Sequence, residues 1–487
     1  MFEHGAERFA VGTLLFLVLE VIAFITIFNV VMKVRSAAGA WAWAMSILAL
    51  PVVAIPLYWI LGRQIFLGYQ DRLTEARKAN EELFRQLSVT LEPYYATLDE
   101  GQRYYTGVLE MLSERRFTRD NEICLLVDGD ATFDAIFASI EEARHYVLVQ
   151  FFIVKDDSLG NRLKDLLIRK AGDGVQVCFL YDEIGSYRLG RRYVRELEAA
   201  GVETSRFHST KGPSNRFQVN FRNHRKIVIV DGLTGFAGGL NVGDEYLGLS
   251  RKFGPWRDTH VRIVGPAVLS LQMVFLGDWY WATHRVPELN WTAVAEADGT
   301  RCGGADMTVL TLPTGPVEAV EGGTMFFLNA INRARERLWI ASPYFVTDES
   351  VRAALVLASL RGVDVRIMIP GKPDKRAPWL ATFSYLAEME AAGVGVFRYL
   401  DGFQHQKVVL VDDAWAAVGT ANLDNRSMRL NFEVSIVVVD RAFATEVAAM
   451  LENDFARCRR APATEYTGRP VWFRLAVRLA RLASPIL

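Results

Sequence analysis

One block of sequence occurs twice in this chain of 487 residues, and its parts follow the same order in both copies. The longest match aligns His224–Asp231 with His405–Asp412. Shorter matches are Glu-Ala-Ala-Gly-Val at 198–202 and 390–394, Arg-Phe or Arg-Tyr at 206–207 and 398–399, and Gly-Val-x-Val at 174–177 and 362–365. Because the order is kept, an ancestral duplication explains the matches, and we expect two similar folded units.

Each copy alternates short β-rich runs with helical stretches. In the first copy we expect strands at 147–154, 175–181 and 226–230, and helices at 160–171 and 192–200. Such alternation predicts an α/β fold on a largely parallel or mixed sheet. We place the two domains at 120–300 and 301–460, with a seam at Gly299–Gly304. Equivalent strand ends would then face each other across a pseudo-twofold axis.

Two apolar runs precede the repeat, at 9–32 and 40–61. Each is long enough to cross a hydrocarbon core of about 30 Å. A cleavable signal would be shorter and end at small residues, whereas Lys33 and Arg35 follow the first run. Aromatic residues mark the ends of the second run, at Trp41, Trp43, Tyr58 and Trp59. We therefore expect a two-helix transmembrane hairpin within residues 1–66.

Charge around the hairpin predicts its orientation. The short loop carries two positive charges, whereas the outer flanks carry five: Arg8, Arg63, Arg72, Arg77 and Lys78. The positive-inside tendency then places both termini and the catalytic region in the cytoplasm of a multi-pass membrane protein. Residues 67–119 are charged and helix-prone, so we expect a membrane-proximal helical linker. Glu20, inside the first run, is given no role.

Composition limits the partners. The net charge of −1 provides no overall field for nucleic acid, so any anion binding must be local. The four cysteines, at 124, 178, 302 and 458, stand singly and predict unpaired buried thiols. In the segment 461–487, Arg474, Arg478 and Arg481 alternate with apolar residues at helical spacing. That pattern predicts a basic amphipathic helix on anionic lipid; the alternative is a helix docked on the protein's own surface.

The repeated His-x-Lys places two functional groups on one strand face. Residues two apart in a strand project to the same side, so His224 points with Lys226 and His405 with Lys407. Asp231 and Asp412 have the opposite parity, seven residues later, and are better placed to fix the following turn than to touch an imidazole. A single His-x-Lys usually starts an ordinary exposed strand, but two equivalent copies favour catalysis.

A small-residue turn and an Asn follow each copy, at Gly238–Asn241 and Gly419–Asn422. Small residues let backbone N–H groups approach an anion, so we expect Asn241 and Asn422 to bind phosphate. A carboxylate then begins a further strand in each half, Asp258 in the first and Glu433 in the second. A nucleophilic imidazole needs an acceptor on its other nitrogen. We expect Asp258 to orient His224, and Glu433 to orient His405.

Two imidazoles, two ammonium groups and two amides around one point suit a phosphodiester. One histidine attacks phosphorus while the other protonates the leaving oxygen, and no metal or other cofactor is required. Zinc is disfavoured because no cysteine or second histidine stands at ligand spacing. The basic residues Arg216, Arg222 and Arg225 are expected either to contact lipid phosphate or to lie in a solvated loop.

The two motifs resemble the paired HKD motifs of the phospholipase D superfamily. Arg-Asn-His-Arg-Lys at 222–226, Gly-Gly-Leu-Asn at 238–241 and Trp-Arg-Asp-Thr-His at 256–260 are similar to its bacterial cardiolipin synthase branch. The region around Pro51 and the ending at 479–487 are similar too. The resemblance implies two tandem phospholipase D-like α/β/α sandwich domains in a cell inner membrane protein. It also implies a catalytic set of His224, Lys226, Asp231, His405, Lys407 and Asp412.

The resemblance further implies the reaction. Phosphatidylglycerol is attacked to give a phosphatidyl-histidine and glycerol, and a second phosphatidylglycerol then accepts the phosphatidyl group to form cardiolipin. By family analogy His224 is the nucleophile and His405 the general acid. The expected partners are phosphatidylglycerol and anionic membrane lipid, with no nucleic acid. Alternatives are a membrane phospholipase D that uses water or another alcohol, a nuclease, and an inactive membrane scaffold; the oligomeric state stays open.

Overall fold

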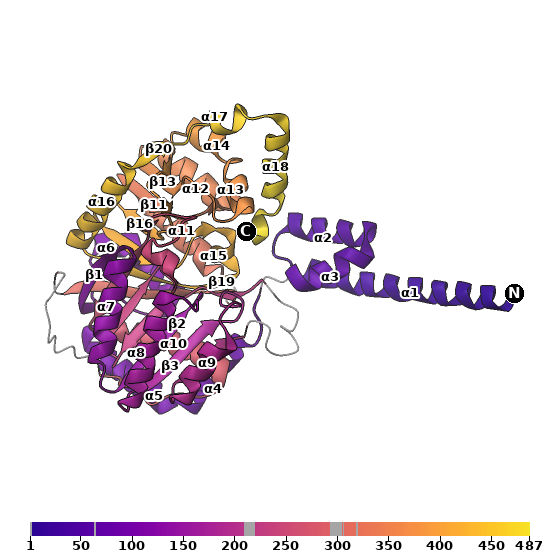
Figure 1. The fold of residues 1–487 in the computed structure, drawn as a ribbon. Helices are drawn as coiled ribbons and strands as arrows, with labels where there is room; N and C mark the ends of the chain where they lie inside the picture. The colour runs from indigo at the N-terminus through magenta and orange to yellow at the C-terminus, as the bar shows by residue number, and fades with distance from the viewer. Residues whose placement is uncertain (1, 63–64, 209–219, 293–303, 305, 318–319) are drawn as a thin grey trace. The chain divides into compact units, whose positions relative to one another are not determined.

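The computed structural model describes the chain except for residues 1, 63–64, 209–219, 293–303, 305 and 318–319 (Figure 1). Residues up to 67, with Asn220 and Phe221, belong to one compact unit; the other described residues, from 68 on, form a second. The predicted seam at 299–304 lies outside the described residues, apart from Gly304.

The N-terminal unit contains three helices, α1 (Phe2–Lys33), α2 (Ala37–Ala49) and α3 (Pro51–Leu61). Only α1, over Ala10–Lys33, is both long and apolar enough to cross a membrane by itself among the described helices. The expected second helix at 40–61 is divided, because Leu50 leaves the helical conformation and Pro51 has no N–H to continue the ladder. The three helices pack through Val30, Ile47 and Tyr58, and most of their other apolar side chains are exposed.

The predicted linker is helical, as α4 (Tyr69–Ala79), α5 (Glu81–Leu91), a 3-10 turn η1 (Glu92–Tyr94) and α6 (Glu100–Ser113). Asp99 and Gln102 form a reciprocal capping box at the start of α6. Helix α6 packs on α11 (Gly322–Arg333), and α4 packs on α10 (Ala267–Thr283). The linker is therefore part of the large unit.

The large unit is built on a mixed sheet of 16 strands. Its centre is the antiparallel pair of β1 (Thr118–Val127) and β10 (Met307–Thr314). Outward from β1 lie β9 (Thr259–Val264), β7 (Thr234–Gly238), β6 (Ile227–Val230), β2 (Tyr146–Phe151), β3 (Gln176–Asp182) and β4 (Glu203–Phe207). Outward from β10 lie β19 (Asn431–Val439), β17 (Trp415–Gly419), β16 (Val408–Val411), β11 (Arg337–Ala341), β13 (Asp364–Pro370), β14 (Gly395–Tyr399) and β20 (Cys458–Arg460). The halves repeat one strand order, as the duplicated sequence predicts.

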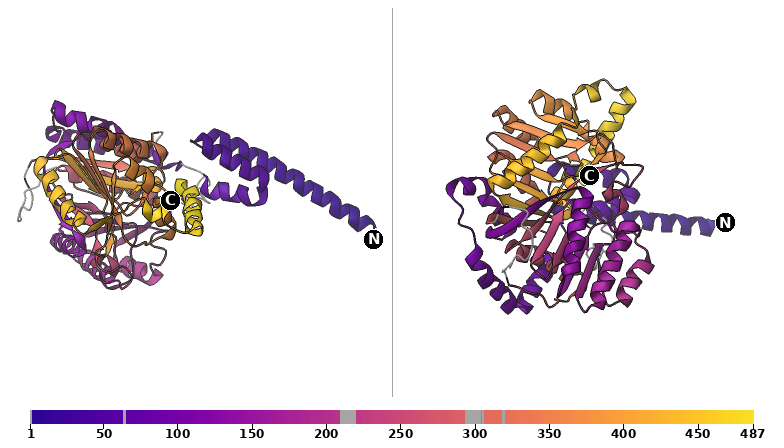
Figure 2. Two further views of the ribbon diagram at one scale, coloured as in Figure 1. Left: turned by 90° about the horizontal axis from the view of Figure 1, so that it is seen from above. Right: turned by 60° about the vertical axis from the view of Figure 1, so that its left-hand side comes forward.

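Helices cover both faces of this sheet (Figure 2). The first half contributes α7 (Asp128–Glu142), α8 (Ser158–Gly172) and α9 (Arg191–Ala199), besides α10. The second contributes α12 (Glu349–Leu360), α13 (Arg376–Thr382), α14 (Leu386–Ala391), α15 (Asn425–Arg429) and α16 (Arg441–Phe455), besides α11. Each half has its own hydrophobic core, which confirms the predicted α/β fold.

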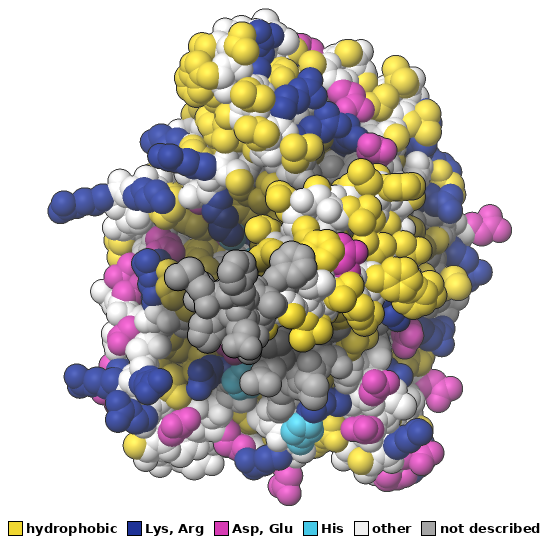
Figure 3. All heavy atoms as spheres, turned by 90° about the vertical axis from the view of Figure 1, so that its right-hand side faces the viewer, with side chains coloured by type: hydrophobic (Ala, Val, Ile, Leu, Met, Phe, Trp, Pro, Cys, Tyr) yellow, Lys and Arg dark blue, Asp and Glu magenta, His cyan; other side chains and the backbone are white. Residues whose placement is uncertain are grey.

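The C-terminal segment forms α17 (Thr464–Thr467), α18 (Val471–Leu482) and a final 3-10 turn. Phe473 and Val477 of α18 are buried in the second core, whereas Trp472, Leu475, Leu479 and Leu482 are exposed. On the side of the molecule drawn in Figure 3, hydrophobic side chains lie among Lys and Arg side chains. One face of this helix is docked on the protein, as the alternative expects, and the binding of anionic lipid by the exposed face stays a prediction.

Of the cysteines, Cys178 and Cys458 are free thiols, as expected. The same expectation is wrong for Cys124, which is disulfide-bonded. Cys302 lies outside the described residues.

Candidate active site

Two short strands that cross between the halves place the two histidines. In the first, β5 (Arg222–Asn223) pairs in parallel with the start of β19, and the backbone N–H of His224 donates to the Phe432 carbonyl at 2.9 Å. In the second, β15 (Phe403–Gln404) pairs in parallel with β8 (Trp256–Arg257), and the N–H of His405 donates to the Arg257 carbonyl at 2.8 Å. His224 therefore lies beside Phe432, the residue before Glu433, and His405 lies beside Arg257, the residue before Asp258.

The carboxylates consequently orient the histidines crosswise. His224 Nδ1 lies 2.8 Å from Glu433 Oε2, and His405 Nδ1 lies 2.7 Å from Asp258 Oδ2. The expectation that each carboxylate serves the histidine of its own half is wrong. The repeat identified the two carboxylates correctly. The short strand pairings that bring each carboxylate to a histidine, however, join one half of the repeat to the other.

Hydrogen bonds fix both carboxylates in turn. Glu433 Oε1 accepts from the Ser427 hydroxyl at 2.7 Å and from Asn431 Nδ2 at 3.1 Å. Asp258 Oδ1 accepts from the backbone N–H of Thr259 at 2.8 Å. Both carboxylates are fully buried, so the imidazoles are held by rigid acceptors.

The small-residue turns make room for this arrangement. A Cβ at Gly239 would stand 1.9 Å from Asp258 Oδ1, so the position tolerates only glycine. The backbone N–H of Gly239 donates to the Thr259 carbonyl at 3.0 Å, and that of Thr420 donates to the Val434 carbonyl at 2.9 Å. These N–H groups are used within the sheet. Gly239 and Thr420 therefore do not offer their N–H groups to an anion, and anion binding by the rest of the two turns stays a prediction.

Burial lowers the pKa of His224 to about 3 and that of His405 to about 4. Burial alone would raise the pKa of Glu433 and Asp258, but the neighbouring histidine and lysine outweigh it, and both carboxyl pKa values lie below their ordinary range. At neutral pH each imidazole is neutral. Its Nδ1–H donates to a carboxylate, which leaves Nε2 as the acceptor nitrogen, and in His405 this atom lies 3.1 Å from Lys407 Nζ.

The lysines of the motif lie close to their histidines. Lys226 Nζ donates to the His224 carbonyl at 2.6 Å, and Lys407 Nζ lies 2.7 Å from His405 Nδ1. Burial lowers the pKa of Lys407 to about 8 and takes that of Lys226 well below its ordinary value. An anion between the two lysines would favour their charged forms.

Both histidines line one cavity of about 670 Å³ in the large unit. Asn241 and Asn422 line it as well; Asn241 Oδ1 accepts from the Ile153 N–H, and the buried Asn422 Oδ1 has no hydrogen-bond partner among the described residues. The lining also has four cationic residues, Arg222, Lys375, Arg376 and Arg426, and three acidic ones, Glu245, Asp374 and Asp424. Burial and mutual repulsion lower the pKa of Arg222 to about 10. The cationic residues of the lining outnumber the acidic ones by one, and the two neutral histidines lie among them.

Two predicted catalytic residues do not touch the imidazoles. The Asp231 carboxylate accepts from the backbone N–H groups of Arg144, His145 and Tyr146, each at 2.8 Å. Asp412 accepts in the same way from residues 335–337 and also from the Tyr105 hydroxyl. Both aspartates adopt positive φ values, 54° and 51°. Each fixes the turn into the neighbouring strand, β2 or β11, as their parity in the sequence predicts, and neither carboxylate touches an imidazole.

The three basic residues predicted near the first motif do not share one location. Arg222 lines the cavity, and Arg216 lies outside the described residues. Arg225 neither contacts the cavity nor lies in a solvated loop, because its buried guanidinium forms an ion pair with Asp278 at 2.8 Å. Arg426 also lines the cavity but was not predicted from the sequence, although it lies only four residues after the predicted Asn422.

The chain resembles known proteins over nearly its whole length. Residues 327–458 match the family model described as "Cardiolipin synthase, PLD-like domain", and residues 21–63 match "Phospholipase_D-nuclease N-terminal". "Cardiolipin synthase A" of Pseudomonas entomophila is 47% identical over 96% of this chain and 97% of its own length, and that of Pseudomonas putida GB-1 is 46% identical over 96% and 97%. A phosphatidylserine synthase structure from Haemophilus influenzae shares the fold, with a TM-score of 0.60, 15% identity and coverage of 80% of this chain and 100% of that one. The chain therefore belongs to the cardiolipin synthase family, with phospholipase D-like domains.

Proposed function

We propose that this chain is a phosphatidyltransferase that makes cardiolipin from two molecules of phosphatidylglycerol. The observation that carries the proposal is the pair of histidines, each held at Nδ1 by a carboxylate of the other half, lining one cavity. A neutral imidazole with a free Nε2 is a competent nucleophile toward phosphorus. The crossed pairing also means that neither half has a complete site alone. A pseudo-twofold relation between the halves accounts for the repeated strand order.

In the first step His224 Nε2 forms a bond to phosphorus, and the bond to the headgroup glycerol oxygen breaks. His405 gives its proton to that oxygen, and glycerol leaves. The phosphorylated imidazole carries positive charge, which the Glu433 carboxylate stabilises. Because the resting pKa of His405 is low, the anionic phosphodiester must raise it for His405 to hold the proton.

In the second step His405, now neutral, takes the proton of a hydroxyl group of a second phosphatidylglycerol. That oxygen attacks phosphorus, the bond to His224 breaks, and cardiolipin is released. Lys226, Lys407, Asn241 and Asn422 stabilise the negative charge on the non-bridging oxygens. Asp231 and Asp412 support the site indirectly, by fixing the strands beside it.

The test is incubation of purified enzyme with phosphatidylglycerol labelled separately in its acyl chains and headgroup. We expect cardiolipin and free glycerol in equal amounts. Phosphatidic acid as the main lipid product would instead indicate water as acceptor, that is, a phospholipase D. Since no proposed step uses a metal ion, we expect chelation to change the rate less than about twofold once lipid dispersion is controlled.

We infer that the N-terminal unit anchors the enzyme in the bacterial inner membrane as a hairpin, with α1 as one pass and α2 and α3 together as the return. Positive charge on the outer flanks favours a cytoplasmic catalytic region. The disulfide at Cys124 weighs against it, because disulfides persist in oxidising compartments. Cysteines introduced at positions 37 and 115 decide the matter: an impermeant reagent on intact cells should label position 37 and spare 115, and the reverse would overturn the orientation.

A further inference from the structure

A second cavity lies away from the histidines, between helices α4, α5 and α10 and the turn after α6. Its walls are largely apolar and include Leu73, Phe84, Leu112, Met273, Val274 and Pro313. It has a volume of about 120 Å³ and shares a wall with a neighbouring hollow of about 540 Å³, whose own apolar lining adds Leu87 and Leu91. None of the residues with a role in phosphatidyl transfer lines either space.

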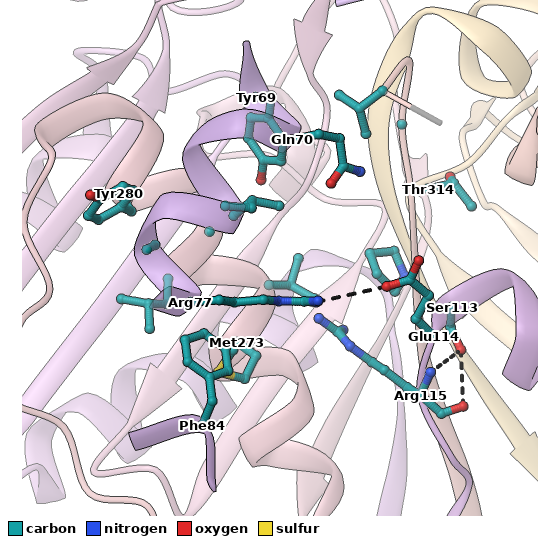
Figure 4. Close-up of a pocket in the computed structure, with 18 of the residues that line it drawn as sticks. Tyr69, Gln70, Arg77, Phe84, Ser113, Glu114, Arg115, Met273, Tyr280 and Thr314 are labelled. Atoms are coloured by element: carbon teal, nitrogen blue, oxygen red, sulfur yellow. Dashed lines mark hydrogen bonds and ion pairs between the residues drawn. The ribbon is translucent and has the colours of Figure 1, made fainter. Parts of the chain in front are cut away.

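Two arginines stand where the two spaces meet. Arg77 from α4 and Arg115 from the turn extend into the cavity toward one another (Figure 4). Arg77 has a carboxylate partner only at 3.9 Å, in Glu114, and both side chains of this pair are largely exposed. An exposed pair of this kind neutralises little charge.

Arg115 is held deeper and is less well neutralised. Its Nη1 donates to the Ser270 carbonyl at 3.3 Å, and within the described part of the chain it forms no ion pair. Burial lowers its pKa to about 10, and the nearby charges of Arg225 and Arg77 lower it further in the same direction. A half-buried guanidinium with a second guanidinium, that of Arg77, beside it favours an anion.

These features select one kind of ligand. A free anion would satisfy the arginines but leave the apolar walls in water, and a neutral lipid would cover the walls but leave the arginines uncompensated. We propose that this is a binding site for a second anionic phospholipid, with its phosphate between Arg77 and Arg115 and an acyl chain along the walls formed by α4, α5 and α10. A guanidinium pair matches a phosphodiester through charge-assisted hydrogen bonds.

The experiment uses full-length enzyme in phosphatidylcholine nanodiscs that contain phosphatidylglycerol with a photoreactive diazirine on one acyl chain. After irradiation, mass spectrometry maps the labelled peptides. We expect label on α4 and α10, reduced at least fivefold in Arg115→Met. The matched control is Arg361→Met, which also removes an arginine bound only to backbone carbonyls and should leave the label unchanged.

Three arms decide the proposal. Peptides from the histidine cavity should keep their label in Arg115→Met, and cardiolipin formation should stay within threefold of wild type, which shows a folded enzyme with its active site intact. Phosphatidylcholine with the same diazirine chain should label α4 and α10 at least fivefold less. Equal labelling by phosphatidylcholine, unchanged labelling in Arg115→Met, or competition by inorganic phosphate as effective as that of phosphatidylglycerol would each overturn the lipid site.

Discussion

The two histidine sites share one construction but differ in their charged surroundings. After burial, the largest influence on the pKa of His224 is the attraction of Glu433, whereas for His405 it is the repulsion of Lys407. Burial dominates both resting pKa values, so these values do not separate the roles; the charged neighbours do. His224 is better placed to carry the positive charge of a phosphorylated imidazole, and His405 to release a proton. The assignment of His224 as nucleophile and His405 as general acid stays a proposal, which rests on family analogy.

The strongest test of this comparison removes each histidine in turn. His224→Ala and His405→Ala should each lower cardiolipin formation by about 10³-fold or more, because each step uses both groups. With a phosphatidyl nitrophenol, whose leaving group needs no proton, His405→Ala should still form an adduct that persists for want of a base. Mass spectrometry should find it on His224. An adduct on His405 in His224→Ala, with none on His224 in the reciprocal variant, would reverse the two roles.

The crossed carboxylates give the next largest effect. Glu433→Gln and Asp258→Asn keep the hydrogen-bonding shape but remove the charge, and each should slow turnover by about 10²-fold. With the nitrophenol substrate, adduct formation in Asp258→Asn should recover to within about fivefold of wild type, because only the general acid is impaired. Adduct formation in Glu433→Gln should stay slow. The opposite pattern would indicate that each carboxylate serves its own half.

The strand-fixing aspartates should affect stability more than chemistry. Asp231→Asn and Asp412→Asn each weaken acceptance from several backbone N–H groups, and each should lower the free energy of unfolding by about 1–3 kcal/mol. The loss should be larger for Asp412, which also accepts from Tyr105. Denaturant unfolding measures the change. A thousandfold loss of kcat in a variant of unchanged stability would restore a direct catalytic role.

The pH dependence of stability gives a change that is spread gradually over several pH units. A histidine whose folded pKa is lowered contributes stability above its unfolded pKa of about 6.5, and this is lost as pH falls toward the folded value. Between pH 6.5 and about 4, each buried histidine should lower the free energy of unfolding by about 1.4 kcal/mol for each unit by which the pH falls. Thermal unfolding of wild type and a His224→Gln, His405→Gln double variant measures the slope, which should be shallower in the variant. Equal slopes would show that the imidazoles are not buried as neutral groups.

Much of the molecule followed from patterns within short stretches of sequence. The repeat predicted two units with one strand order, and the strands around Val149, Phe179 and Val228 followed from their apolar runs. His-x-Lys, the two asparagines and the two carboxylates were identified because duplication marks them twice. The strand inferences succeeded since strand periodicity is a local property of a sequence, whereas the roles of the repeated histidines, lysines and asparagines stay predictions.

Only the tertiary structure decided how those residues meet. The pairing of His224 with Glu433 and of His405 with Asp258 depends on two-residue ladders between segments about 200 and 150 residues apart, which no local pattern encodes. The same holds for the pairing of Arg225 with Asp278 and for the capping of distant turns by Asp231 and Asp412. Side chains that serve chemistry and side chains that hold strands together carry the same polar groups, and only their neighbours in space distinguish them.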